Sequence, residues 1–139
     1  MERSLVLVKP DAMKRGYGGA IIGRLQERGL KLIAMKMIHI DKALAERHYA
    51  VHKGKPFFND LIGYITSTPV IAAVFQGDDA IATARKTMGA TDPAKADKGT
   101  IRADFGANIQ ENAVHGSDSV ETAKKEISLY FSEKEIFSY

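Results

Sequence analysis

The alternation of apolar and polar residues along the chain predicts strands separated by helices. Residues 5–8 and 70–75 are continuous apolar runs, and residues 31–40 are rich in branched side chains, so all three are typical of buried strands. On this pattern alone, strands that are apolar on both faces favour a parallel sheet. The sequence therefore predicts a layered α/β domain with a small sheet of about four strands.

Five further segments repeat apolar residues at the spacing of one helix face, with turn or capping residues at their ends. They begin near Gly18, Asp41, Pro56, Asp79 and Asp118. The second is expected to place Leu44, His48 and Val51 on one face. In the last, Glu121 lies three residues after Asp118, which is the spacing of reciprocal capping at a helix start. Residues 133–139 have the character of a tail.

One long segment resists assignment to a helix or a strand. Residues 90–112 show no hydrophobic period and contain a proline and glycines. Loops without structure rarely exceed roughly 12 to 15 residues, and those that do are usually functional or disordered. Because this segment holds Arg102 and Asn112 and leads directly to His115, we favour a functional loop.

Composition is typical of one ordinary globular domain that spans residues 1–139, with 45% hydrophobic and 27% charged residues. The net charge of +3 suits an anionic ligand but is too small to indicate a nucleic-acid binder. The absence of cysteine excludes disulfides, thiolate metal sites and cysteine catalysis. Since the first apolar run has only four residues, too few for a secretory or membrane-spanning segment, we expect a cytoplasmic protein.

His115 is the strongest candidate for a catalytic histidine, because it lies between a short apolar run and a helix start and has a glycine beside it. His39, His48 and His52 lie in predicted strands or helices and are interpreted as structural or surface residues. No second histidine or cysteine lies at a ligand spacing from His115, so zinc is disfavoured. No Gly-x-Ser-x-Gly turn occurs, which disfavours a serine hydrolase. A nucleophilic imidazole that carries a phosphoryl group remains.

Phosphoryl transfer requires cations and hydrogen-bond donors around the phosphates. The candidate donors are Lys9, Arg85, Thr91, Arg102 and Asn112, although each taken alone is more typical of a solvated surface residue than of a ligand contact. The glycines of residues 16–19 match neither standard phosphate-binding motif, so they are interpreted as a turn. Phe57 and Phe58 adjoin at a helix start, where one can face the core and the other can stack on a base.

The segment Asn-Ala-Val-His-Gly-Ser-Asp-Ser at residues 112–119 resembles the signature of the nucleoside diphosphate kinases. Further blocks resemble this family in the family's order: Lys9-Pro10-Asp11, Arg15-Gly16, Tyr49, Pro56-Phe57-Phe58, residues 89–93 and residues 99–105. The resemblance covers nearly the whole chain. It implies a ferredoxin-like α+β sandwich with a four-stranded antiparallel sheet, and it makes His115 the phosphorylated residue in transfer from nucleoside triphosphates to nucleoside diphosphates.

The resemblance also assigns roles to individual residues. The base would stack between Phe57 and Ile109, which admits any base and either sugar. The groups that would hold the ribose and phosphates are Lys9, Tyr49, Arg85, Thr91, Arg102 and Asn112, and those that would orient the His115 ring are Ser117 and Glu126. Mg²⁺ is implied as a cofactor held mainly by the nucleotide phosphates, with no protein metal ligand.

Two departures from the animal members of the family place the chain with its bacterial type. The chain stops at Tyr139, and Gln110-Glu111 stands where animal members carry Gly-Arg. A homo-oligomer is implied, with tetramer and hexamer both open. No membrane partner and no obligate nucleic-acid partner are expected, and the preferred nucleotide is left open.

Two other classes of protein stay open at this point. The same kind of sheet carries RNA-binding modules, but these display aromatic residues on their central strands, and residues 5–8 and 70–73 have none. A histidine phosphocarrier that takes phosphate from a protein partner is the second alternative. It would not require Phe57, Thr91 and Arg102 around a nucleotide.

Overall fold

The sheet of this protein is antiparallel throughout. The structure, a computed structural model, describes residues 1–139. Its strands are β1 (Glu2–Val8), β2 (Lys31–Ile38), β3 (Val70–Gly77) and β4 (Val114–Gly116), in the order β2-β3-β1-β4. All three strand pairs run antiparallel, so the parallel sheet favoured by the apolar pattern alone is wrong and the one implied by the family resemblance is confirmed.

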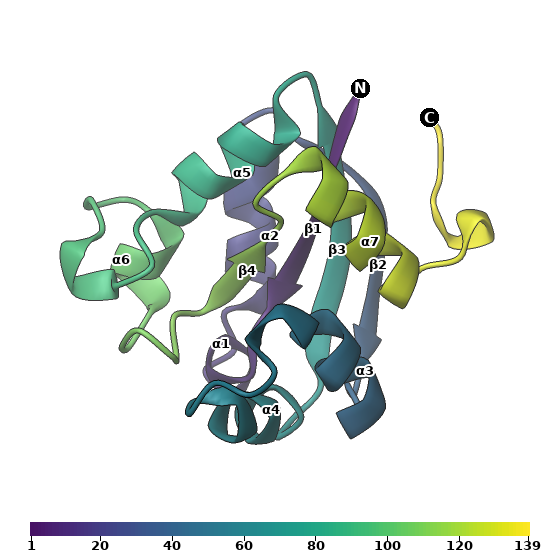
Figure 1. The fold of residues 1–139 in the computed structure, drawn as a ribbon. Coiled ribbons are helices and arrows are strands. Elements are labelled where there is room, and N and C mark those ends of the chain that lie inside the picture. Colours follow the sequence, from purple (N-terminus) through teal and green to yellow (C-terminus); the bar gives the residue numbers. More distant parts are fainter.

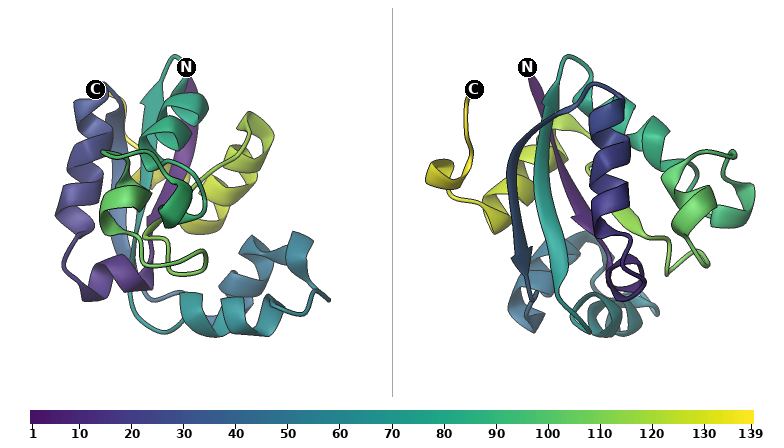
Figure 2. Two further views of the ribbon diagram at one scale, coloured as in Figure 1. Left: turned by 90° about the vertical axis from the view of Figure 1, so that its left-hand side faces the viewer. Right: turned by 180° about the vertical axis from the view of Figure 1, so that it is seen from behind.

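Helices cover both faces of the sheet, which explains why the pattern misled (Figure 1). The helices are α1 (Pro10–Lys14), α2 (Gly18–Glu27), α3 (Lys42–His48), α4 (Phe58–Ile65), α5 (Ala80–Met88), α6 (Ile101–Phe105) and α7 (Val120–Tyr130). Figure 2 shows α2 and α5 on one face and α7 on the other. A central strand between two helical layers needs apolar side chains on both faces, whether the strands run parallel or antiparallel. The antiparallel four-stranded sheet with helices packed on it is the ferredoxin-like sandwich.

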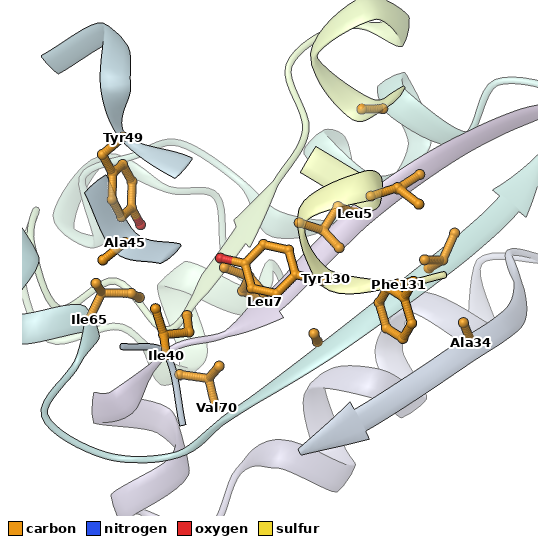
Figure 3. Close-up of a cluster of buried hydrophobic side chains, with 14 of the residues drawn as sticks. Leu5, Leu7, Ala34, Ile40, Ala45, Tyr49, Ile65, Val70, Tyr130 and Phe131 are labelled. Carbon is orange, nitrogen blue, oxygen red and sulfur yellow. The ribbon is translucent and has the colours of Figure 1, made fainter. Parts of the chain in front are cut away.

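The core consists of two hydrophobic clusters, one on each face of the sheet. Along β1, Leu5 and Leu7 belong to the cluster beneath α3, α4 and α7, whereas Val6 and Val8 belong to the cluster beneath α2 and α5. This division follows from the alternation of side chains along a strand. In Figure 3, Leu5 and Leu7 lie beside Tyr130 of α7. These four consecutive residues of β1, Leu5 to Val8, are all fully buried.

Several boundaries differ from the sequence-based expectations. The segment after β1 forms a short helix, α1, and the long unassigned segment contains α6 and a 3-10 turn, Pro93–Lys95. Helix α3 ends at His48, so Val51 is 81% exposed and does not share the predicted helical face. The helix cap of α7 is Ser119, whose side chain accepts from the Thr122 backbone N–H, and the predicted Asp118 cap is wrong.

The C-terminal residues are held against the sheet edge. A 3-10 turn spans Glu133–Glu135, and the Phe137 N–H then donates to the Ile33 carbonyl of β2 at 2.9 Å. None of the helices combines the length and the apolar composition needed to cross a bilayer.

Candidate active site

The strand register decides which way His115 faces. His115 is the middle residue of β4 and pairs with Leu7 of β1. Directly opposite residues of an antiparallel pair project to the same face, so His115 lies on the Leu7 face, beneath α7. Because β4 is a short edge strand, the imidazole keeps 20% of its surface exposed. The ring is therefore reachable by a ligand while one side of it packs on protein.

Helix α7 presents a carboxylate to that imidazole. Its buried stripe of Ala123, Glu126, Ile127 and Tyr130 follows helical spacing, with one acid among apolar residues. Glu126 Oε1 lies 3.1 Å from His115 Nε2. A carboxylate accepts protons in hydrogen bonds, so the proton of the neutral ring belongs on Nε2, and the lone pair of Nδ1 is left free.

Ser117 reinforces the position of the carboxylate. Its side chain is fully buried, and its hydroxyl donates to Glu126 Oε1 at 2.7 Å. The Ser117 Oγ also accepts from the Leu5 backbone N–H at 3.0 Å. The carboxylate that faces His115 is therefore tied to the central strand, as expected of a residue that orients the imidazole.

His48 is a member of this network that the sequence interpretation missed. Its side chain is only 2% exposed, and its Nε2 lies 3.3 Å from Glu126 Oε2. Its Nδ1 lies 2.8 Å from the Tyr130 hydroxyl, and its ring meets the edge of the His115 ring at a centroid distance of 4.8 Å. No spacing in the sequence indicates these contacts, because α3 and β4 meet only through packing on α7 and the sheet.

Electrostatics keep the imidazole neutral and the carboxylate charged. Burial lowers the pKa of His115 below 6.5, against the opposing effect of the hydrogen bond to Glu126, so the free base dominates at neutral pH. Burial alone would raise the pKa of Glu126, but the hydrogen bond from His115 and the nearby His48 ring hold it well below its usual value. A neutral imidazole with a free Nδ1 is the form that attacks an electrophile.

A cavity of about 470 Å³ opens in front of the imidazole. Of the residues proposed from the sequence, its lining includes Tyr49, Arg85, Thr91, Arg102, His115 and Glu126. The Tyr49 hydroxyl and Arg102 Nε are buried there without a protein hydrogen-bond partner. Burying polar groups unpaired is unfavourable, so these atoms are suited to a polar ligand.

The two arginines differ in how firmly they are held. Arg102 donates to the Gly89 carbonyl at 3.1 Å and to the Val114 carbonyl at 2.9 Å. Burial and the neighbouring Arg85 lower the pKa of Arg102 to about 10, which leaves it cationic at neutral pH. Arg85 is exposed and makes one longer contact, 3.5 Å, with the Gly116 carbonyl. Of these two arginines, Arg102 is therefore held by two short hydrogen bonds and Arg85 by one longer contact.

Lys9 and Asn112 form a buried pair beside this cavity and are not part of its lining. Lys9 Nζ donates to Asn112 Oδ1 at 2.9 Å, and the Asn112 amide donates to the carbonyls of Thr91 and Ile109. Burial, aided by the charge of Arg102, lowers the pKa of Lys9 to about 8. An ammonium that is this poorly solvated gains much from a nearby anion.

Phe57 and Ile109 lie at the surface rather than in the lining of the cavity. Phe57 is 47% exposed, while Phe58 is 9% exposed and packs in the core, so one ring faces the core and the other stays free as expected. The stacking of Phe57 on a base stays a prediction. The Phe57 ring lies 5.3 Å from that of His52, which lines the cavity. Ile109 is 62% exposed, and its carbonyl holds Asn112.

Tertiary structure also assembles residues of the types that bind metals. Ligand atoms of His48, His115 and Glu126 all lie within 4.8 Å of one another, a grouping that sequence spacing did not reveal. In this arrangement both oxygens of Glu126 face imidazole nitrogens, and one also accepts from Ser117. The prediction that no protein residue serves as a metal ligand stays a prediction.

A neutral imidazole in a cavity lined by arginines, on a ferredoxin-like sandwich, is the arrangement expected of a phosphotransferase. The family described as "Nucleoside diphosphate kinase" matches residues 2–136 of the chain. The nucleoside diphosphate kinase of Dehalococcoides mccartyi strain 195 is 58% identical over all 139 residues and 98% of its own length. The Listeria monocytogenes serotype 4a enzyme is 57% identical over the whole chain and 95% of its length.

Solved structures agree with these relatives. The Aquifex aeolicus nucleoside diphosphate kinase superposes with a TM-score of 0.95 at 42% identity, over 98% of this chain and 99% of that one. The Halobacterium salinarum enzyme, solved in complex with CDP, gives a TM-score of 0.96 at 45% identity, over 99% of this chain and 92% of that one. The chain belongs to the nucleoside diphosphate kinase family, and it is an enzyme that transfers phosphate between nucleotides.

Proposed function

We propose that His115 Nδ1 carries the phosphate between a donor triphosphate and an acceptor diphosphate. The contact between His115 Nε2 and Glu126 Oε1 supports this most directly, because it leaves the Nδ1 lone pair free. Nδ1 attacks the γ-phosphorus, the bond from phosphorus to the β-γ bridging oxygen breaks, and the diphosphate leaves. A terminal oxygen of the second diphosphate then attacks the same phosphorus, and the N–P bond breaks. One cavity serves both nucleotides in turn, so the kinetics are ping-pong.

The cations around the cavity neutralise charge on the phosphates during both steps. Arg102 faces the transferred γ-phosphate, and Arg85 with Thr91 holds the β-phosphate. The unpartnered Tyr49 hydroxyl donates near the phosphates, which the raised pKa of Tyr49 favours, because burial and the charge of Glu126 keep it protonated. Lys9 and Asn112 bind the ribose hydroxyl and phosphate oxygens. Donors fixed before the reaction stabilise the developing charge most effectively.

The base stacks between Phe57 and Ile109. The exposure of both side chains supports this role, since neither is needed for the core. Stacking depends weakly on base identity, so purine and pyrimidine, ribose and deoxyribose nucleotides are all substrates. The Halobacterium salinarum relative in complex with CDP supports binding of nucleotides in this fold.

Mg²⁺ reaches the site on the nucleotide. The cavity lining holds several cationic side chains but only two carboxylates, Asp118 and Glu126, and Glu126 is already engaged by two histidines. This donor set fits a cation whose ligands are mainly phosphate oxygens and water. When bound, Mg²⁺ would supply positive charge to the phosphates, and the residues named above orient these phosphates.

The remaining parts of the proposal concern the whole molecule. Residues 1–139 act as one domain, since both hydrophobic clusters pack on the same sheet. The protein works as a homo-oligomer, a tetramer or a hexamer, in the cytoplasm, with nucleoside triphosphates and diphosphates as its partners. Neither nucleic acid nor a membrane is required.

The experiment that tests the proposal is intact-mass measurement after incubation with ATP and Mg²⁺. One added phosphate that is lost in acid is expected for the native protein, and subsequent addition of CDP should remove it and produce CTP. His115→Ala should fold with an unchanged thermal midpoint and gain no phosphate. A folded His115→Ala protein that still exchanges phosphate at the native rate would refute the assignment. Phosphate acquired but not delivered to CDP would instead indicate a phosphocarrier.

A further inference from the structure

Ala113 stands two residues before His115 and has an unusual backbone conformation. Its φ is +74°, and it is the sole non-glycine residue of the chain with a positive φ. A side chain with a Cβ crowds the backbone in this region, so the conformation is unfavourable unless its surroundings hold it. The Val114 N–H donates to the Asn112 carbonyl at 2.9 Å, which closes a tight turn around Ala113. The turn is therefore a strained segment immediately before β4.

Two side chains from other parts of the chain hold that turn. Asp11 of α1 is 7% exposed, and its Oδ2 accepts from the Ala113 backbone N–H at 3.1 Å. Its other oxygen, Oδ1, accepts from the Tyr64 hydroxyl of α4. The Ala113 carbonyl in turn accepts from the Lys9 backbone N–H at 2.9 Å. Both polar groups of the Ala113 backbone are thus bound to the segment that follows β1.

The turn lies between a residue that adjoins the cavity, Asn112, and a residue that lines it, His115. Asn112 precedes Ala113 and its side chain binds Lys9 and two loop carbonyls, while His115 follows on β4. A change of φ at Ala113 would rotate the chain before it relative to the chain after it. The distance between the Asn112 and His115 side chains therefore depends on this one residue.

We propose that Asp11 and Tyr64 are positioning residues, which act through the strained Ala113 turn to hold His115 and Asn112 in register for phosphoryl transfer. This inference rests on the proposed role of His115. Neither side chain lines the cavity, so their effect reaches the nucleotide only through the backbone. In the absence of the Asp11 carboxylate, Ala113 relaxes toward negative φ and the His115 ring moves away from the line of attack.

The test compares variants in the rate at which ATP and Mg²⁺ phosphorylate His115 and in the KM for nucleotides. Asp11→Ala is expected to lower this rate about 100-fold with KM within threefold, because a displacement near 1 Å at the reacting atoms has an effect of this order. Asp11→Asn should stay within about fivefold, since its amide can still accept from Ala113 and donate to Tyr64. Asp104→Ala, which removes a partly exposed ion pair with Arg24 outside the cavity, is the matched control and should leave the rate unchanged.

The double variant Asp11→Ala/Ala113→Gly separates positioning from general damage. Glycine adopts a positive φ without steric strain, so it should restore the rate of Asp11→Ala at least tenfold. A folded Asp11→Ala protein with the native rate, or one that Ala113→Gly fails to rescue, overturns the proposal. If Asp11→Ala does not fold, the same comparison is made with Tyr64→Phe, which removes one hydroxyl. This variant should lower the rate several-fold, and Ala113→Gly should restore it. A native protein that forms no phosphoenzyme would reject the role of His115 and not the role of Asp11.

Discussion

Replacing Glu126 by glutamine is expected to slow the phosphorylation of His115 by about 30- to 100-fold while it leaves nucleotide binding nearly unchanged. Glutamine has almost the same shape, and its amide oxygen can still accept from His115 Nε2 and from the Ser117 hydroxyl. The orientation of the ring is therefore kept. The substitution removes the negative charge and turns the oxygen that faces His48 Nε2 into an amide donor, while the contacts with His115 and Ser117 are kept.

The magnitude follows from the geometry. When Nδ1 bonds to phosphorus, positive charge develops on the imidazole, with Nε2 at 3.1 Å from Glu126 Oε1. A full unit charge at that distance interacts by about 5 kcal/mol at an effective dielectric constant near 20. With roughly half of the charge developed in the transition state, the loss is about 2 to 2.7 kcal/mol, which corresponds to the stated factor.

The assay is rapid-quench measurement of acid-labile phosphoenzyme after mixing with ATP and Mg²⁺. Glu121→Gln, on the exposed side of α7, is the matched control and should retain the native rate. The pH profile gives a second readout, because the hydrogen bond to Glu126 raises the pKa of His115. Without that charge the pKa of His115 falls further, so the acid limb of kcat/KM moves to lower pH. A Glu126→Gln protein within threefold of the native rate would refute the electrostatic reasoning.

Three further predictions concern the residues around the phosphates and the base. Because the pKa of Lys9 is about 8, the nucleotide KM should rise above pH 8 as Lys9 loses its charge, and Lys9→Met should abolish that rise. The free energy of unfolding should increase between pH 8 and the unfolded pKa of 10.5, because the unfolded chain binds more protons in that range; urea titrations measure it. Arg102→Ala should lower kcat/KM by roughly 10² or more and also lower the thermal midpoint, because Arg102 binds two backbone carbonyls. Phe57→Ala should raise KM about tenfold for every base, with unchanged stability; a base-selective effect in steady-state kinetics would contradict stacking.

The sequence alone named many of the residues that line or adjoin the cavity, because they lie in local motifs. His115, Arg102 and Asn112 stand in or just before one short signature region, and Lys9 directly follows a recognisable strand. The central strands and most helices were also predictable, since hydrophobic periodicity reports which faces are buried. The direction of the strands was not predictable from that pattern, because central strands covered on both faces look alike in parallel and antiparallel sheets.

The family resemblance named Glu126 as a residue that orients His115, but it did not name His48, and only the tertiary structure brings both to the site. His48 and Glu126 come from α3 and α7, and their contacts with His115 exist because both helices pack on the Leu5 and Leu7 face of the sheet. The hold of Asp11 on Ala113 likewise joins α1 to the entrance of β4. Such contacts depend on how whole helices and strands pack, and the pattern of a short sequence segment does not predict that packing. Local patterns therefore determine which side chains can do chemistry, and packing determines which groups orient them and set their charge.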